Sequence, residues 1–567
     1  GLADATGDSS KGSFYQRLQS TDPKWLPREV RRLRVHVTTG SVGLAAAEAV
    51  AAGERTEEWL VCSSLGRGAP RICQMCLTPE GRQLKLMPWG GAAARLSTTS
   101  TNALPTGEED KETALAAMAQ PIQGQLANLP IKGQAFCFLP LPAETGLPVH
   151  TNGFFELSAN RRDIWYGDDM VGAGKLRAEW NSALLQDVVA PSYLRLLMFV
   201  REQLKGKPQY YALWPQRRPA EPWGGLVDVL YQMLLQQSAL FSEVQGGVWV
   251  SPVGAVFAAS EGEDGQAAEV VAMDGALLRS GMPLVRVPPA VHRLLDDAAV
   301  ALGVELRSAS PAMVREWLIA QRSWEEGVSR EEGMALLRHC VRGVGGETAR
   351  SLRGLRVLPL LDGSWGRFEA AGEGTPLLLC SADERTLLER RPRLVVDVDP
   401  ASSLGQVLGR IAASGETNLQ VFSAGLVSSL LPSLLPARWR GLEVVELAAE
   451  GEGDDVVGPG AVAEGDAGPP IGWLLALWEY LGRHHADTHL GQLAGWPLLP
   501  AEGGRAYALP AHGLRASRML DLSESDEALS SCVCAAGCLA LHSEVSRVHP
   551  QLQHVVHAAS ACGILRA

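Results

Sequence analysis

The sequence lacks an apolar run long enough to span a membrane. The nearest candidate, Val421 to Leu435, is interrupted by serines and by Pro432, whereas a spanning helix needs about 20 mainly apolar residues. Positive charge is also scarce, because 51 Lys and Arg stand against 63 Asp and Glu and give a net charge of -12. Nucleic-acid backbones and anionic membranes select clustered cations. We therefore predict that neither nucleic acid nor a membrane is a partner.

Cysteine is sparse and has no framework spacing. Ten cysteines are spread over 567 residues, and nothing at the N-terminus resembles a secretory signal, so we expect a reducing, intracellular compartment. The catalytic patterns G-x-S-x-G and H-E-x-x-H and the dinucleotide-binding glycine fingerprint are also missing. Since no nucleophile and base can be paired, we predict that the chain is not itself an enzyme.

What is present indicates a large globular chain. Hydrophobic residues make up 46% and charged residues 20%, as in folded domains. A chain of 567 residues exceeds what one core usually serves, so we expect three to four domains or closely packed subdomains. It begins in a Gly-, Ser- and Asp-rich segment without an initiator methionine. We therefore expect it to be a piece of a longer protein.

The densest pattern lies between Phe136 and Asn181. Phe136 to Leu141 is an apolar run that predicts a buried strand ending at the prolines, and Val149 to Leu157 predicts a second strand. Arg161 and Arg162 follow in what reads as an extended segment, so only one of them can face a given partner. Apolar residues at four-residue spacing then predict a helix from Leu176, with a second helix starting at Pro191.

The rest of the chain repeats a simpler unit. An apolar run, a glycine turn and another apolar run occur three times, at 244–258, 355–370 and 495–510. Each predicts a β-hairpin that starts an α/β subdomain. A helix is predicted before the first of them, at 226–240, and helices are predicted between them at 313–321, 331–341 and 471–481.

The segment 136–197 resembles the sacsin family, which consists of very large Hsp90-related chaperone-like proteins. The likeness is specifically to the internal repeat of these proteins. The motifs that carry the likeness follow in a specific order over about 60 residues. They are FCFLPLP (136–142), ETGLPVH (144–150), NGFFELSANRR (152–162), GKLRAEWN (174–181) and APSYLRLL (190–197). WLVCSSLG and PWGGAAARL echo the repeat more weakly upstream, and the hairpin cassettes do so downstream.

The resemblance implies a role within a larger machine. In such proteins this block lies downstream of an Hsp90-type nucleotide-binding domain, so ATP and Mg would be bound there and no cofactor within this chain. It implies that Arg161 or Arg162 reaches the terminal phosphate of the nucleotide. The implied partners are client proteins and Hsp70-type chaperones, in the cytoplasm. The alternative is that the two arginines are ordinary solvated or salt-bridged surface residues.

The expected fold class is mixed α/β: an Hsp90-middle-like mixed sheet with helices, followed by repeated hairpin-plus-helix subdomains. The expected segments are a disordered linker (1–28), the sacsin-repeat core (29–204), α/β subdomains (205–345 and 346–448), an acidic Gly-rich loop (449–470) and a C-terminal α/β subdomain (471–567). The expected function is that of a sacsin-like chaperone or co-chaperone fragment. The alternative is a non-catalytic protein-interaction scaffold.

Other possible sites have simpler explanations. Gly172, Gly174 and Lys175 do not form a P-loop, which needs Gly at the position of Asp169 and Ser or Thr at that of Leu176. Four more groups suggest zinc, helix-end or acid–base sites, but each is better explained as packing, helix-dipole or loop residues. They are Cys73 with Cys76; Cys532, Cys534, Cys538 and His542; His484, His485 and His489; and the pairs Asp168/Asp169 and Asp397/Asp399.

Overall fold

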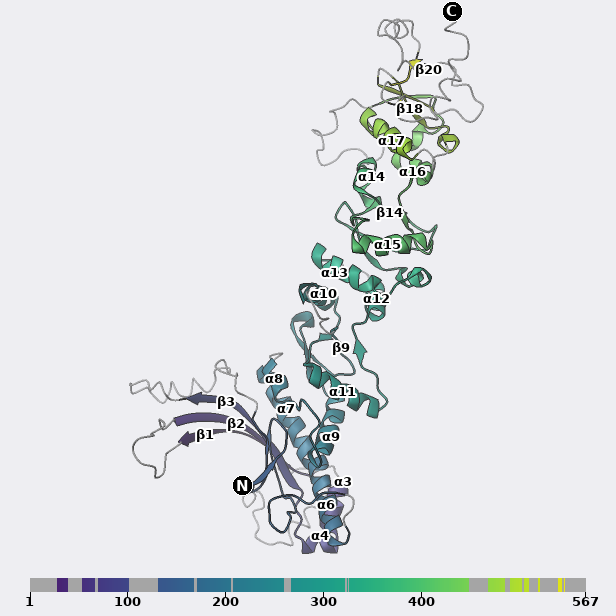
Figure 1. Ribbon diagram of the computed structural model, residues 1–567. Coiled ribbons are helices and arrows are strands. Elements are labelled where there is room, and N and C mark those ends of the chain that lie inside the picture. The colour runs from purple at the N-terminus through teal and green to yellow at the C-terminus, as the bar shows by residue number, and fades with distance from the viewer. Residues whose placement is uncertain are drawn as a thin grey trace, which may run out of the picture. The chain divides into compact units, whose positions relative to one another are not determined.

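The computed structural model describes residues 28–38, 54–66, 70–100, 131–167, 171–204, 208–259, 267–321, 324, 326–447, 468–484, 490–501, 504–508, 519–520, 539–542 and 545. The chain divides into two compact units, Gly1–Ser310 and Pro311–Ala567. Both mix helices with small sheets, which confirms the predicted mixed α/β class (Figure 1). The first unit contains the motif block and positions the candidate site.

A six-stranded mixed sheet is the centre of the first unit. Its strand order is β1-β2-β3-β6-β4-β5, and all pairs are antiparallel except β4 with β6. The strands are β1 (Arg28–Thr38), β2 (Glu54–Leu65), β3 (Trp89–Ser100), β4 (Gln134–Cys137), β5 (Leu139–Glu144) and β6 (His150–Gly153). Two short helices, α3 (Pro70–Leu77) and α4 (Pro79–Gln83), connect β2 to β3.

The predicted single strand at Phe136–Leu141 is wrong, because the chain reverses there. Phe138 takes a φ of +61°, and Cys137 pairs with Leu139 across the turn. The prolines do not end a strand either, since Pro140 lies inside β5 and pairs with Phe136. Proline removes a ladder donor, and an edge strand such as β5 tolerates that loss. The pattern therefore predicted extended structure correctly but missed the reversal.

The glycines of WGGAAARL (89–96) do not form a turn. Gly90 and Gly91 lie within β3 and pair with β2 and β6. A β-carbon on Gly91 would lie 2.4 Å from the carbonyl oxygen of Cys62, and one on Gly90 would lie 3.0 Å from Val189. The glycines therefore allow close approach of neighbouring backbone and helix to the strand.

One long helical segment follows the sheet, where two helices were predicted. It comprises α6 (Ala173–Leu184), the π-helical turn η3 (Leu185–Val189) and α7 (Ala190–Leu204). The N–H of Ala190 bonds to the carbonyl of Leu185, five residues earlier. Pro191 has no N–H and would break a regular α-helix, but a π-turn just before it accommodates the missing bond. Pro191 therefore does not begin a separate helix.

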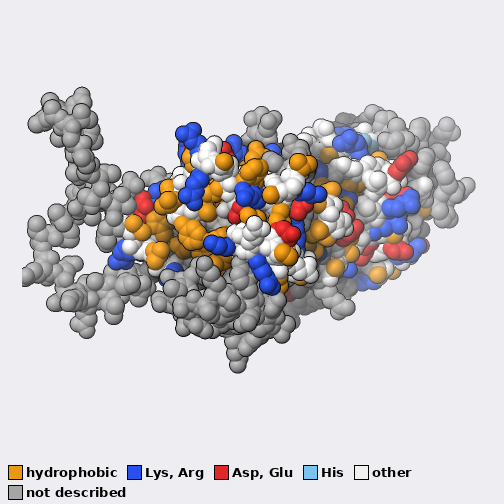
Figure 2. Space-filling view, turned by 90° about the horizontal axis from the view of Figure 1, so that it is seen from below, with side chains coloured by type: hydrophobic (Ala, Val, Ile, Leu, Met, Phe, Trp, Pro, Cys, Tyr) orange, Lys and Arg blue, Asp and Glu red, His pale blue; other side chains and the backbone are white. Residues whose placement is uncertain are grey.

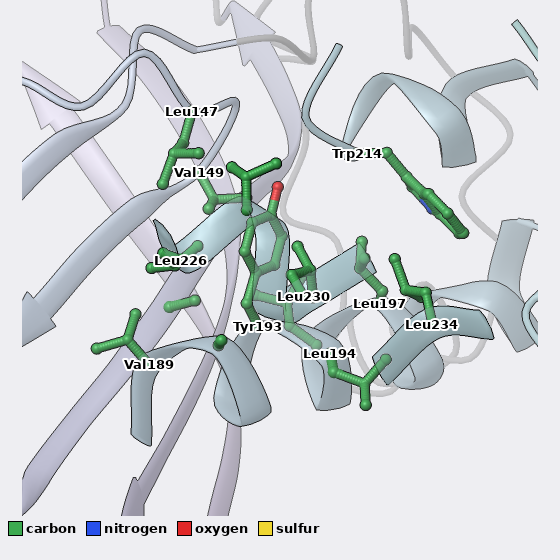
Figure 3. Close-up of a cluster of buried hydrophobic side chains, with 14 of the residues drawn as sticks. Leu147, Val149, Val189, Tyr193, Leu194, Leu197, Trp214, Leu226, Leu230 and Leu234 are labelled. Atoms are coloured by element: carbon green, nitrogen blue, oxygen red, sulfur yellow. The ribbon is translucent and has the colours of Figure 1, made fainter. Parts of the chain in front are cut away.

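This segment is the only one among the described residues that is long and apolar enough to cross a membrane by length and composition. Of its most apolar window, 67% is buried inside the protein. Its side chains pack against the sheet and against α9 (Trp223–Leu235). Figure 3 shows Leu194 and Leu197 beside Leu230 and Leu234. Its apolar character is thus explained by the core of the first unit.

The first cassette completes the first unit. Strands β7 (Leu240–Ser242) and β8 (Val248–Val250) form its hairpin, which begins earlier than predicted. The second apolar run instead forms β9 (Val256–Phe257), in a parallel sheet with β10 (Leu284–Val285) and β11 (Arg307–Ser308). The remaining helices are α8 (Pro208–Ala212), η4 (Val244–Gly246), α10 (Ala267–Arg279) and α11 (Pro289–Ala301).

The other two cassettes form the predicted hairpins in the second unit. They pair β12 (Arg356–Pro359) with β13 (Trp365–Arg367), and β18 (Pro497–Ala501) with β19 (Arg505–Ala508). A parallel sheet lies between them in sequence, of β15 (Val395–Val396), β14 (Leu377–Leu379) and β16 (Leu419–Val421). β17 (Val444–Glu446) pairs with β19, and β20 (Met519–Leu520) pairs with β21 (Leu539–Ala540).

The predicted helices of the second unit are confirmed within a few residues. They are α12 (Pro311–Ala320), α13 (Arg330–Val341) and α17 (Ile471–Arg483). Further helices are η5 (Gly346–Leu352), α14 (Ala382–Leu387), η6 (Pro392–Leu394), α15 (Ser403–Ala413), η7 (Ala424–Leu426), α16 (Val427–Leu434), η8 (Ala437–Trp439) and η10 (Leu490–Leu493). The predicted linker (except Arg28) and most of the predicted acidic loop lie outside the described residues. The domain boundaries stay predictions.

Candidate functional site: the Arg161–Arg162 turn

The two predicted arginines lie at the tip of a closed turn that follows β6. Leu157 and Ile164 form an antiparallel bridge at its base. The N–H of Ser158 donates to the carbonyl of Asp163 at 2.8 Å. The segment was predicted to be extended, which is wrong, because it doubles back on itself within six residues.

Side chains of the turn close it further. Asn160 Oδ1 accepts hydrogen bonds from the hydroxyl of Ser158 at 2.6 Å and from the N–H of Arg162 at 3.0 Å. Ser158 Oγ in turn accepts from the N–H of Asp163 at 3.2 Å. Asn and Ser favour such local side-chain to backbone bonds, which makes them strong turn formers. Ser158 and Asn160 of the motif therefore shape the loop that presents the arginines.

Arg161 has a strained backbone. Its φ is +56°, in the left-handed region, which costs a residue with a side chain roughly 1–2 kcal/mol. Arg161 and Arg162 are both exposed, and neither forms an ion pair with any other described residue. The two guanidinium groups are therefore available to an outside anion.

A buried asparagine anchors the base of the turn. Asn181, fully buried on α6, accepts a hydrogen bond from the N–H of Glu156 at 2.8 Å through Oδ1. Its Nδ2 donates to the carbonyls of Glu156 at 2.8 Å and Trp165 at 2.9 Å. One amide thus holds both chain segments that lead into and out of the arginine turn.

Two tryptophans reinforce this attachment. Trp180 Nε1 donates to the carbonyl of Phe154 at 2.8 Å, and Trp165 Nε1 donates to the carbonyl of Leu157 at 2.7 Å. Since Trp180 precedes Asn181 on α6, neighbouring residues of the helix bind successive parts of the loop. The motifs NGFFELSANRR and GKLRAEWN are therefore joined by hydrogen bonds.

An ion pair lies beside the same attachment. Arg177 Nε is 3.4 Å from Glu156 Oε2, and its guanidinium lies 5.8 Å from the centre of the Trp165 ring. Burial raises the pKa of Glu156, while the charge of Arg177 opposes the rise. The guanidinium group of Arg177 is thus occupied by contacts within the chain, in contrast to those of Arg161 and Arg162.

Two cavities are lined in part by residues that follow the two arginines in sequence, but neither is lined by Arg161 or Arg162. One of about 490 Å³ includes Asp163 and Arg218 in its lining, and one of about 570 Å³ includes Arg71 and Lys175. Arg218 is bound on both oxygens of Asp228, at 2.9 and 3.1 Å, and also pairs with Glu221. The charge of Arg218 is therefore neutralised. Tyr166 contributes to the lining of both cavities.

The remaining sequence candidates that fall on described residues do not form a metal site. Cys76 is buried in α3 and Cys73 is half-buried there, and no group of three His, Cys, Asp or Glu suits a metal ion among the described residues. His484 is the C-cap residue of α17, and its ring centre lies 4.7 Å from that of Tyr480 in a tilted arrangement. Lys175 lies in the first turn of α6, after Gly172 and Gly174. Cys532, Cys534, Cys538, His485, His489, Asp168 and Asp169 lie outside the described residues.

Two further candidates have structural partners. Asp397 was expected in a solvated loop, but its carboxylate is 28% exposed and is bound by Arg330 and, at 3.0 Å, by Arg385. Asp399 accepts from the N–H of Ala401 at 2.9 Å, as a turn residue does. Both carboxylates therefore serve the second unit's own fold. The backbone N–H of His542 donates to the carbonyl of Pro500 at 3.0 Å.

Sequence reasoning did not single out Asn181, although it named the motif that contains it. The available signal was a polar residue on the buried face of α6, next to Ala178, Ala183 and Leu184. Such a residue needs partners, and the backbone of the preceding loop supplies them.

Comparison with known proteins confirms the resemblance predicted from the motifs. Over 545 residues the chain is 30% identical to sacsin of Homo sapiens, an alignment that covers 90% of this chain and 11% of sacsin. The chain thus spans about a tenth of that relative's length. No protein-family model matches the chain, and no solved structure matches it. The chain is therefore sacsin-like over most of its own length.

Proposed function

We propose that this chain is a segment of a sacsin-like chaperone or co-chaperone. It couples an Hsp90-type nucleotide-binding domain, carried upstream in a longer protein, to the handling of client proteins. Hsp70-type chaperones are further partners, and the protein works in the cytoplasm. The observation that carries the proposal is the exposed, anchored turn that bears Arg161 and Arg162.

The chemistry of the turn supports a phosphate contact. A guanidinium group carries a permanent charge and donates paired hydrogen bonds that match phosphate oxygens. Arg161 keeps a side chain where glycine would be less strained, and strained residues concentrate at functional sites. In this proposal one of the two arginines meets the terminal phosphate when the nucleotide domain docks against the turn.

The proposal divides the labour between the two parts of the protein. ATP and Mg belong to the upstream domain, and this chain supplies the arginine but hydrolyses nothing by itself. An arginine that stabilises a transferring phosphoryl group is worth about 10³–10⁵ in rate in other nucleotide hydrolases. The hydrogen bonds of Asn181 would limit the conformational freedom of the turn. They would thereby lower the entropic cost of positioning the guanidinium group.

The test is the double variant Arg161→Ala, Arg162→Ala in a protein that carries the nucleotide-binding domain. We expect ATP turnover to fall at least tenfold with an unchanged circular dichroism spectrum. Arg293→Ala is the matched control, because Arg293 is an exposed arginine of the same unit, on α11, and should leave turnover unchanged. Unchanged turnover in the double variant would refute the role of the arginines.

A second candidate function is a non-catalytic interaction scaffold. It is favoured by the apolar groove of about 570 Å³ on one face of the six-stranded sheet, lined in part by Trp59, Trp89 and Phe136. In that case the double arginine variant keeps full ATP turnover. It also keeps its binding to partners that contact other surfaces, such as the groove. The same experiment thus separates the two candidates.

A further inference from the structure

Strand β1 is an open edge of the six-stranded sheet. All eleven of its residues pair with β2 on one side, and no described strand pairs with its other side. An edge of this length, about 35 Å, presents a row of backbone N–H and C=O groups to any extended chain that reaches it. Such edges bind peptides by adding them as a further strand.

One face of this edge is apolar at Leu33 and Val35, and Arg31 precedes them on the same face. Leu33 and Val35 are 44% and 40% exposed, and both line the groove that continues over Trp59 and Val61 of β2. Figure 2 shows hydrophobic side chains gathered with Lys and Arg among them on the side of the molecule that it draws. An added strand would cover Leu33 and Val35 with its own side chains at cross-strand distance.

The other face of the edge is basic. Arg32 and Arg34 alternate with Leu33 and Val35, so they point to the opposite side of the sheet. Both contact a single carboxylate, Glu58, at 2.8 and 3.4 Å. Two guanidinium groups on one carboxylate leave an excess of positive charge. Over its whole length β1 carries four arginines and one glutamate.

We propose that β1 binds an extended segment of another protein in which apolar and acidic residues alternate. The segment adds as a seventh strand, with its apolar side chains beside Leu33 and Val35 and its carboxylates beside Arg32 and Arg34. Backbone bonds supply affinity, and the two faces select the sequence. This proposal rests on the strand and does not depend on the nucleotide role of Arg161 and Arg162.

A second copy of this chain fits the edge poorly. Pairing β1 with β1 so that the apolar faces align brings the arginines of both strands together on the other face. Like charges directly opposite each other in a sheet are destabilising. The charge pattern therefore favours an acidic partner over self-association.

The test uses three nine-residue peptides with blocked ends, titrated into the full chain by fluorescence anisotropy. The first alternates valine and glutamate, the second replaces glutamate by lysine, and the third is the glutamate peptide with alternate backbone nitrogens methylated on the pairing edge. We expect the first to bind at least tenfold more tightly than either of the others and to weaken with added salt. No binding of the first, or equal binding of the second or third, would show that the proposal is wrong.

Two protein variants locate the site. Val35→Glu places a carboxylate on the apolar face of β1 and should weaken the glutamate peptide at least tenfold. Val300→Glu makes the same change at a valine of α11 that is 78% exposed and should leave binding within twofold of wild type. Equal affinities for both variants would place the peptide elsewhere and overturn the proposal. The proposal would also be overturned if sedimentation velocity showed that the wild-type chain is a dimer and that Val35→Glu dissociates this dimer.

Discussion

Replacing Asn181 by alanine tests whether the helix holds the arginine turn. The change removes the donor and acceptor that bind Glu156 and Trp165. The carbonyl of Glu156 keeps a second bond, from the N–H of Trp165 at 3.1 Å. Two groups are then left without their partner, the N–H of Glu156 and the carbonyl of Trp165.

The expected cost follows from these two groups. A buried polar group without a partner costs about 1–3 kcal/mol, so we expect Asn181→Ala to destabilise the turn by about 3 kcal/mol. Since 1.4 kcal/mol is a factor of ten, the opening equilibrium of the turn should increase roughly 100-fold. The assay is hydrogen–deuterium exchange by mass spectrometry on peptides that cover residues 154–166.

A second buried asparagine provides the control. In the second unit Asn418 accepts from the N–H of Glu369 at 2.9 Å and donates to the carbonyls of Arg367 and Thr375, at 3.2 and 2.9 Å. Asn418→Ala should speed exchange around residues 367–375 and leave 154–166 unchanged. An increase below about fivefold at the turn in Asn181→Ala would refute the anchoring role.

Asn181→Asp adds a pH dependence to the same test. Aspartate keeps the acceptor for the N–H of Glu156, but when ionised it faces the two carbonyls to which Asn181 donates. Burial should raise the folded-state pKa of this carboxyl above its unfolded value near 3.9. The protonated form is then favoured on folding, so the variant should be less destabilised near pH 4 than at pH 7. Urea unfolding at the two pH values measures this difference, and equal losses would contradict it.

Three further predictions concern other positions. Arg161→Gly relieves a backbone at φ +56°, so we expect the turn to gain about 0.5–1 kcal/mol in exchange measurements, and unchanged exchange would show that the backbone is not strained. Gly333→Ala places a β-carbon 1.9 Å from the Trp365 ring and should lower the urea stability of the second unit by about 1–3 kcal/mol, despite the better helix propensity of alanine; equal stability would show that Trp365 moves aside freely. Burial raises the pKa of Cys76 to about 12, so iodoacetamide at pH 8 should modify this thiol at least 100-fold more slowly in the native chain than in guanidinium chloride, and a rate within tenfold would contradict its burial.

Local pattern predicted much of the secondary structure. The helices α9, α12, α13 and α17 follow from apolar residues at helical spacing, and the hairpins β12–β13 and β18–β19 follow from glycine turns between apolar runs. These signals depend only on residues close in sequence. The resemblance to sacsin was also carried by contiguous motifs, and the comparison confirms it.

The errors fall where distant segments meet. Gly90 and Gly91 suggest a turn, but they lie in a strand because a neighbouring strand and a helix approach them. Pro191 suggests a helix start, but it lies within a long helix because a π-turn precedes it. Phe138 carries no turn signal, yet the chain reverses there with its ring stacked on Trp89 at 5.9 Å. Each outcome depends on contacts that a single segment does not reveal.

By itself, the sequence determined the mixed α/β class, the hairpin cassettes, the sacsin-like motif block and the pair of arginines within it. Only the tertiary structure decided that those arginines are exposed on a closed turn, that Asn181 anchors the turn, and that β1 leaves an open edge. The reason is physical. Periodicity and turn chemistry act over a few residues, whereas burial, hydrogen-bond partners and strand neighbours depend on residues far apart in the chain.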